Sequence, residues 1–222
     1  MPFTYRGGVD TESSAPATTR TRTVSPARIA KYQAERQQIM RAAYELIQRD
    51  GSKETSVHDV LRETGLSTRA FYRHFRSKDE LVLEMYRVDS ERVAANLTAA
   101  VASAATPLDA LEVWIDQNLA VVYDARRLRH AVVLASPEVA SAEGYTEVHL
   151  AGMAAQREPL VGVLGEGKRS GVFPFTEPDA DAFAIQAVVG AHMRARVQHA
   201  GGLTRAEARA HTVALFRRAL GA

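Results

Sequence analysis

Two short helical segments on either side of a glycine turn are the feature that most constrains this sequence, within TSVHDVLRETGLSTRAFYRHF at residues 55–75. Ser56 and Asp59 fit the Ser-x-x-acid capping box that begins a helix. Gly65 ends that helix, because glycine adopts the left-handed conformation at a helix end without strain. Ser67 then caps a second short helix. Helices joined in this way are typical of a helix-turn-helix, whose second helix enters the major groove of DNA.

The second helix carries two kinds of side chain. Phe71 and Phe75 lie four residues apart, on a face that we expect to be buried. Side chains at the N-terminal end of such a helix reach base edges, and arginine there can pair with guanine. Hydroxyl and basic side chains contact phosphates, as can the N–H groups that begin the preceding helix. We therefore predict base contacts by Ser67, Thr68 and Arg69, and backbone contacts by Thr55, Ser56, Tyr72, Arg73, His74 and Lys78.

The remaining sequence also has the pattern of helices. Apolar residues recur at three- and four-residue spacings between Pro26 and Asp50, which predicts an amphipathic helix. Further helices are predicted from residue 78 to about residue 100, and over 107–126, 127–135, 144–168, 178–200 and 204–220. No segment alternates apolar and polar residues as a strand would. The predicted fold class is all-α.

Composition and charge limit the possible functions. The 222 residues include no cysteine, which excludes disulfides, thiolate catalysis and cysteine-based zinc sites. No apolar run approaches the ~20 residues of a membrane span, and no signal segment is visible, so we expect a cytoplasmic protein without a membrane partner. Residues 20–78 contain 13 Lys and Arg against 6 Asp and Glu, whereas residues 82–222 contain 14 against 16. The basic N-terminal third indicates a polyanion partner, although chance clustering of solvated arginines explains it about equally well.

The run at 55–81, with AAYELIQRDG before it, resembles the DNA-binding domain of the TetR family of bacterial transcription regulators. The matching features are the Thr-Ser helix start, the Gly-apolar-Ser turn, the aromatic-Tyr-x-His-Phe core and the Ser-Lys-acid-acid-Leu start of the next helix. The resemblance adds His58, which stands where the family often has an arginine or another polar base. It departs at Phe71, where leucine is more usual. The contacts it implies are Thr68 and Arg69 to bases, and Tyr72, His74 and Lys78 to phosphates.

We expect three parts along the chain. Residues 1–24 are rich in Ser, Thr, Ala and Pro without hydrophobic periodicity, which predicts a disordered basic tail. Residues 25–80 form a three-helix DNA-binding domain with the helix-turn-helix. Residues 81–222 form a larger helical domain, to which the resemblance assigns ligand binding and dimerisation.

The larger domain offers two sets of candidate residues. Small side chains at three- and four-residue spacings in 180–195 allow another helix to approach closely, with packing inside one chain as the alternative. The resemblance implies a four-helix dimer interface at Ala184, Ala187, Ala191, Ala195, Val213, Phe216 and Leu220. Polar groups on apolar faces fit either a pocket for an amphipathic ligand or a core with satisfied polar residues. As a group, the pocket candidates are Tyr86, Trp114, Asn118, Tyr123, His149, Met153, Phe183 and His192.

Other classes of function remain as alternatives. An enzyme is disfavoured, because GVLGEGKRSG at 162–171 lacks the preceding strand and the hydroxyl of a phosphate-binding loop. No catalytic elbow or metal-binding motif occurs either. A DNA-binding activator or architectural protein would need no ligand. We expect a homodimeric repressor without cofactor or metal, which binds a near-palindromic DNA operator and is released by a small, largely apolar effector.

Overall fold

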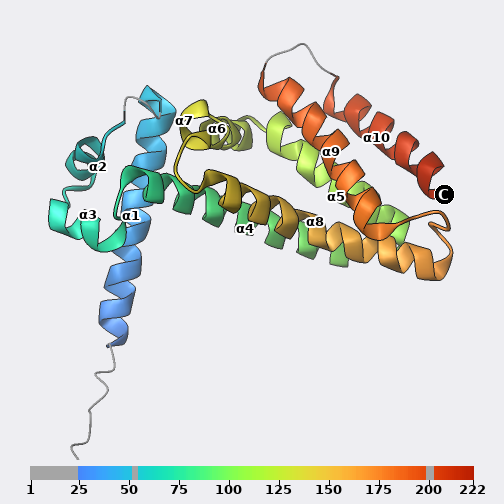
Figure 1. Cartoon of the computed structure of the whole chain (residues 1–222), viewed down its shortest axis with the longest axis horizontal. Coiled ribbons are helices and arrows are strands. Elements are labelled where there is room, and N and C mark those ends of the chain that lie inside the picture. The colour runs from blue at the N-terminus through green and yellow to red at the C-terminus, as the bar shows by residue number, and fades with distance from the viewer. Residues whose placement is uncertain (1–24, 52–54, 199–202) are drawn as a thin grey trace, which may run out of the picture. The chain divides into compact units, whose positions relative to one another are not determined.

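The computed structural model describes residues 25–51, 55–198 and 203–222, so the expected tail at 1–24 lies outside the described residues. Within these ranges every regular element is an α-helix, as predicted (Figure 1). The helices are α1 (Pro26–Asp50), α2 (Val57–Thr64), α3 (Thr68–His74), α4 (Lys78–Ala102), α5 (Pro107–Tyr123), α6 (Ala125–Leu134), α7 (Pro137–Ala140), α8 (Tyr145–Ser170), α9 (Pro178–Val197) and α10 (Arg205–Leu220).

Side-chain caps set several of the helix starts. The hydroxyls of Ser67, Ser77 and Thr106 each accept a hydrogen bond from the backbone N–H three residues further on. Such a bond satisfies one of the N–H groups that a helix start leaves without a partner. At α10, Thr204 and Glu207 form a complete capping box. These local signals explain why the helix starts lie where the sequence predicts them.

The segment from 107 to 135 departs from the prediction. α5 ends at Tyr123, before the predicted end at residue 126, and α6 begins at Ala125. The carboxylate of Asp124 causes the break, because it accepts hydrogen bonds from the N–H groups of Arg126 and Arg127 at 3.0 and 2.8 Å. Ser136-Pro137, predicted only as the end of a helix, begins the four-residue helix α7.

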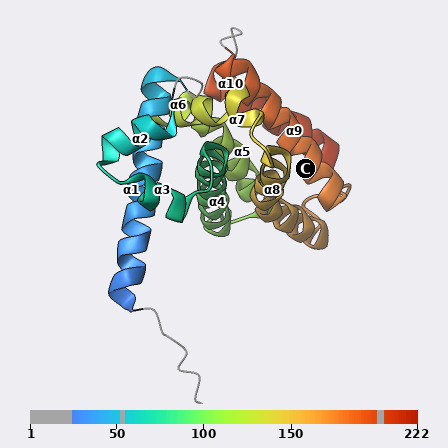
Figure 2. The ribbon, with the colours of Figure 1, turned by 60° about the vertical axis from the view of Figure 1, so that its left-hand side comes forward.

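The described residues have two apolar clusters. The N-terminal cluster joins α1, α2 and α3 to the first turns of α4 and to Val133 and Val139 of α6 and α7. The C-terminal cluster is formed by α5, α8, α9 and α10, with Trp114 fully buried at its centre, and includes Leu97 of α4. α4 therefore begins in one cluster and ends in the other. It runs beside α8 over much of its length (Figures 1 and 2).

By its internal contacts the chain divides into residues 1–35 and 36–222. The second unit contains both apolar clusters. The expected division at residues 80 and 81 stays a prediction, and it would fall at the start of the helix that the two clusters share. Among the described helices, none combines the length and the apolar character needed to cross a membrane.

Candidate nucleic-acid interface

The two faces of α3 differ in exposure. Thr68, Arg69, Tyr72 and Arg73 are exposed, and Tyr72 keeps 55% of its surface accessible. The buried face consists of Ala70, Phe71, His74 and Phe75. Two residues in each turn thus face solvent and two face the protein, as the 3.6-residue period requires. The exposed face presents a hydroxyl, a phenol and two guanidinium groups on a short, supported helix.

Arg36 of α1 holds the buried face of α3 in place. Its guanidinium lies 4.5 Å from the ring centroid of Phe75 and donates to the carbonyl oxygen of His74 at 3.1 Å. The same guanidinium pairs with the carboxylate of Glu84 on α4 at 2.7 Å. The rings of Phe71 and Phe75 lie 5.9 Å apart inside the N-terminal cluster. One arginine therefore ties α3 to both neighbouring helices.

The turn between α2 and α3 has the expected geometry. Gly65 has a φ of 66°, in the left-handed region, and its N–H donates to the carbonyl of Leu61 at 2.9 Å. A side chain would be strained at this φ. The Gln38 amide of α1 donates to the carbonyl of Thr64 at 3.0 Å. The angle between α2 and α3 is thus fixed by backbone conformation and by a contact from α1.

The start of α2 differs from the prediction. The side chain of Thr55 is buried and donates to the carbonyl of Gly51 at 2.8 Å, so it does not face a DNA backbone. The N–H and hydroxyl of Ser56 both donate to the carboxylate of Asp59, at 3.0 and 2.5 Å. These bonds hold the pKa of Asp59 below its ordinary value, with the Ser56 hydroxyl as the largest cause. The N–H and hydroxyl of Ser56 are therefore used by the capping box, and a phosphate contact by the other N–H groups that begin α2 stays a prediction.

The side chain of His74, for which the sequence predicts a phosphate contact, lies on the buried face of α3. The reason is geometric, because residue 74 lies three and four positions after Phe71 and Ala70 and shares their side of the helix. His58 on α2 is exposed, and Lys78 at the start of α4 is half-buried. The contacts predicted for His58, Lys78 and the exposed residues of α3 stay predictions.

The pocket candidates differ in burial and in hydrogen bonding. The hydroxyl of Tyr86 lies 2.6 Å from Nδ1 of His149, and the ring of Tyr145 stacks on that imidazole. Burial raises the pKa of Tyr86 to about 12. Trp114 and Asn118 are buried and bonded, with the indole N–H donating to the carbonyl of Gln156 at 3.0 Å and the Asn118 amide to the carbonyl of Trp114 at 2.9 Å. These two correspond to the satisfied-core alternative.

The other four candidates lie on α5, α8 and α9. Tyr123 is half-buried, and its hydroxyl donates to the carbonyl of Leu203 at 2.5 Å. Met153 and His192 are half-buried, and the carbonyl of Met153 accepts from Gln186. Phe183 is exposed over 63% of its surface. None of these side chains lines the groove described next.

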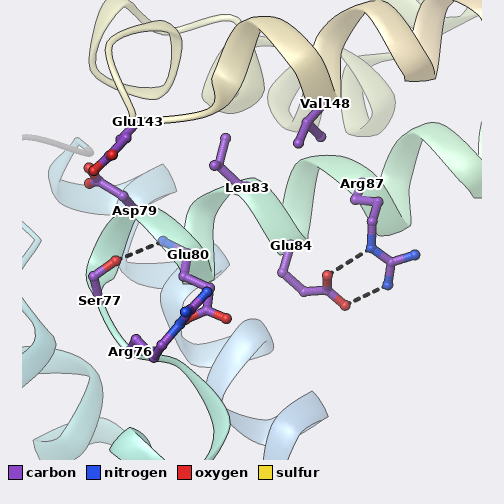
Figure 3. Close-up of a pocket in the computed structure, with 9 residues that line it drawn as sticks. All are labelled: Arg76, Ser77, Asp79, Glu80, Leu83, Glu84, Arg87, Glu143 and Val148. Carbon is purple, nitrogen blue, oxygen red and sulfur yellow. Dashed lines mark hydrogen bonds and ion pairs between the residues drawn. The ribbon is translucent and has the colours of Figure 1, made fainter.

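A charged groove of about 570 Å³ lies between the start of α4 and the start of α8 (Figure 3). Its lining residues are Arg76, Ser77, Asp79, Glu80, Leu83, Glu84, Arg87, Glu143 and Val148. The carboxylates of Asp79 and Glu143 point toward one another across it. Hydrogen bonds from Arg87 and then Arg36 hold the pKa of Glu84 below its ordinary value. Sequence reasoning missed this groove, because its walls come from segments more than fifty residues apart.

The predicted dimer residues fall into two groups. On α9, Ala187 and Ala191 are exposed, and Ala184 and Ala195 are half-buried. On α10, Val213, Phe216 and Leu220 are buried in the C-terminal cluster of the same chain. These three pack within their own chain, and their part in a dimer stays a prediction. A partner helix on α10 would instead meet side chains such as Leu215, which is 43% exposed.

Comparison with known proteins gives a consistent result. The profile of the bacterial regulatory proteins of the tetR family matches residues 39–85. No curated protein sequence matches the chain. A structure assigned as a transcriptional regulator from Pseudomonas aeruginosa PAO1 is similar, with 20% identity, a TM-score of 0.71 and coverage of 91% of this chain and 95% of that one.

Two further solved structures share the fold. A protein from Mesorhizobium loti assigned to the TetR family has 18% identity and a TM-score of 0.67, over 85% of this chain and 97% of that one. The regulator FadR from Bacillus subtilis, solved in complex with stearoyl-CoA, has 16% identity and a TM-score of 0.65, over 81% and 96%. At these identities the similar structures support the fold alone, and the matched profile supports the assignment of the DNA-binding domain.

Proposed function

We propose that this chain, a DNA-binding transcription regulator of the TetR family by its matched domain and its fold, is a dimeric repressor released by a small effector. Two copies would place their α3 helices about 34 to 36 Å apart, in successive major grooves of a near-palindromic operator. Residues 25–80 would bind DNA, and residues 81–222 would bind the effector and the second copy. Such a protein would act in the bacterial cytoplasm, where its DNA is.

The exposed face of α3 is the observation that carries this proposal. Thr68 and Arg69 lie at its N-terminal end, where a recognition helix meets base edges. Tyr72 and Arg73 follow one turn later on the same exposed face, suited to phosphates. Within the described residues Arg69 forms no ion pair, so its donors are available for a base.

Selection of bound fragments from genomic DNA tests the proposal directly. We expect a near-palindromic motif with half-site centres about one helical turn apart. The Arg69→Ala variant should select a changed motif, because a bidentate arginine discriminates its base by about 1–3 kcal/mol. If that variant returned the wild-type motif at unchanged stringency, Arg69 would not read a base. If the wild type enriched no motif, sequence-specific DNA binding by this chain would be refuted.

The shared helix α4 supports control by an effector. Its first turns pack in the N-terminal cluster, and Leu97 packs in the C-terminal cluster. An effector that prefers one placement of α4 would change the distance between the two α3 helices of a dimer by its differential affinity for the two states. The similar FadR structure contains stearoyl-CoA, which supports an amphipathic effector class for this fold without identifying the ligand here.

A DNA-binding activator or architectural protein without a ligand is the second candidate. Three of the pocket candidates favour it, since Trp114 and Asn118 are used in the core and Phe183 is exposed. Operator fusions to a reporter gene distinguish the candidates. A repressor gives higher expression when its gene is deleted, whereas an activator gives lower expression.

A further inference from the structure

We propose that Arg36 is a positioning residue for DNA binding, which sets the orientation of α3 without contacting DNA itself. α3 is only seven residues long, too short to hold a stable helix by its own backbone hydrogen bonds. The direction in which its exposed side chains point is therefore set by contacts from other helices. This inference rests on the proposed function only in treating α3 as the helix that enters the major groove.

The guanidinium of Arg36 acts as a C-terminal cap that another helix supplies. The last carbonyls of a helix have no partner within it, and the helix dipole places a partial negative charge there. Nη1 of Arg36 donates to the carbonyl of His74, the last residue of α3, at 3.1 Å. The same guanidinium lies 4.5 Å from the ring centroid of Phe75, where the chain leaves the helix in an extended conformation. Arginine suits both contacts, because its planar cation can donate and stack at the same time.

Glu84 of α4 holds this guanidinium in place. Nη2 of Arg36 pairs with Oε1 of Glu84 at 2.7 Å, and the two side chains are 27% and 14% exposed. Arg87 pairs with the same carboxylate at 2.7 Å, so that Glu84 lies between two cations. A partly buried pair of this kind is screened by salt less than a pair on the open surface. Glu84 therefore acts on α3 through Arg36.

Two other bonds hold the chain on either side of α3. Before the helix, the Gln38 amide of α1 donates to the carbonyl of Thr64 at 3.0 Å. After it, the N–H of Arg76 donates to Oε2 of Glu80 at 2.6 Å. Arg36 differs from both, because it bonds the last residue of α3 itself. With the flanking bonds in place, loss of Arg36 should change the orientation of α3 without unfolding the domain.

The placement of Arg36 distinguishes it from a residue that contacts DNA. Its guanidinium lies on the buried side of α3, over the ring of Phe75, which is 1% exposed. A phosphate contact strengthens binding to every DNA sequence and adds about one unit to the salt slope. Base contacts instead need side chains in a defined register, so a positioning residue affects the specific site above all.

Binding of the purified full-length protein to two DNA duplexes tests this role. One duplex is the genomic fragment that the wild type enriches most strongly, and the other is a scrambled sequence of the same composition. We expect Arg36→Gln to weaken binding to the enriched duplex by about three- to thirtyfold, below the full range for hydrogen bonds to a charged group because the guanidinium is partly exposed. Binding to the scrambled duplex and its salt slope should stay unchanged.

Two further variants separate the contacts of the guanidinium. Arg36→Lys should retain part of the discrimination between the duplexes, because lysine keeps the charge without the planar fork. Glu84→Gln should weaken binding to the enriched duplex less than Arg36→Gln does. In the Arg36→Gln background it should have no further effect, because residues that act through one contact are not additive. Full additivity of the two changes would refute the action of Glu84 through Arg36.

Arg205→Gln is the matched control, because Arg205 also joins two helices through a carboxylate, that of Asp116 at 2.5 Å. It should lower the thermal midpoint and leave the discrimination between the duplexes unchanged. Equal loss of discrimination in this control would reduce the effect to general stability and overturn the proposal.

Two results with Arg36→Gln would also refute the positioning role. One is wild-type discrimination between the duplexes. The other is equal weakening of both duplexes with a salt slope lower by about one unit, as a direct phosphate contact would give. If the wild type enriched no fragment at all, the proposed function would be refuted and this role with it. Enrichment by the wild type with an unaffected Arg36→Gln would refute this role alone.

Discussion

Replacement of Gly167 by alanine should destabilise the C-terminal cluster. A methyl carbon at this position would lie 2.0 Å from Cδ2 and 2.6 Å from Cε2 of Phe173. The ring has no room to move away, because Phe173 is fully buried and its N–H donates to the carbonyl of Gly167 at 3.0 Å. Overpacking of this kind costs about 1–3 kcal/mol. Alanine recovers up to about 1 kcal/mol of helix propensity, so we expect a net loss of up to about 2 kcal/mol.

Gly165 in the same helix provides the control. An added methyl group there has no heavy atom within 4 Å, so Gly165→Ala should gain up to about 1 kcal/mol from helix propensity alone. For a protein of this size, 1 kcal/mol corresponds to about 2–4 °C in the thermal midpoint. In thermal unfolding at one protein concentration, Gly167→Ala should therefore have a lower midpoint than the wild type, and Gly165→Ala a higher one. A Gly167→Ala midpoint at or above that of the wild type would refute the packing argument.

Three further predictions concern the DNA-binding face, acid stability and self-association. Tyr72→Phe and Lys78→Ala should weaken binding to all DNA sequences similarly, and Lys78→Ala should flatten the salt dependence by about one unit of slope, as measured by titration at several salt concentrations. Because the pKa of Glu84 is depressed, its ion pairs stabilise the fold above the ordinary value of 4.5 and are lost as pH falls through the depressed pKa. The thermal midpoint of the wild type should therefore fall more steeply as the pH is lowered than the midpoint of Glu84→Gln. Parallel dependences of the two midpoints on pH would count against this. Ala187→Glu on the exposed stripe of α9 should shift sedimentation toward the monomer, with Glu166→Gln on exposed α8 surface as the neutral control.

Local sequence signals were sufficient for most of the fold. Ser67, Ser77 and Thr204 cap helices that begin where the sequence predicts them, because a cap depends on residues only three positions apart. The break at Asp124 could have been found in the same way, since an aspartate is as good a cap as a serine. It was hidden by the continuous apolar pattern of the flanking residues. Helix ends inside such a pattern need tertiary contacts to be located.

The site was less accessible to sequence reasoning. Periodicity shows that Val213, Phe216 and Leu220 share a face, but it does not say whether the neighbour is the same chain or a second copy. The structure places these three against the chain's own core. The burial of His74 could have been read from its periodicity, because it lies three residues after Phe71, whereas its predicted phosphate contact came from its chemistry and from the resemblance. The charged groove depends on contacts between distant segments, for which a single sequence carries no signal.

Because α4 contributes side chains to both apolar clusters, its length sets the distance and the rotation between the two sets of side chains. Each residue of an α-helix advances about 1.5 Å and turns by about 100°. One residue inserted between Met85 and Leu97 would thus rotate one end of α4 relative to the other. The side chains of α4 in one cluster would then turn away from their partners, while those in the other cluster stayed packed. A compensating insertion would have to restore a whole number of turns, about seven residues for two. The number of residues in the middle of α4 is therefore fixed by the two clusters at its ends.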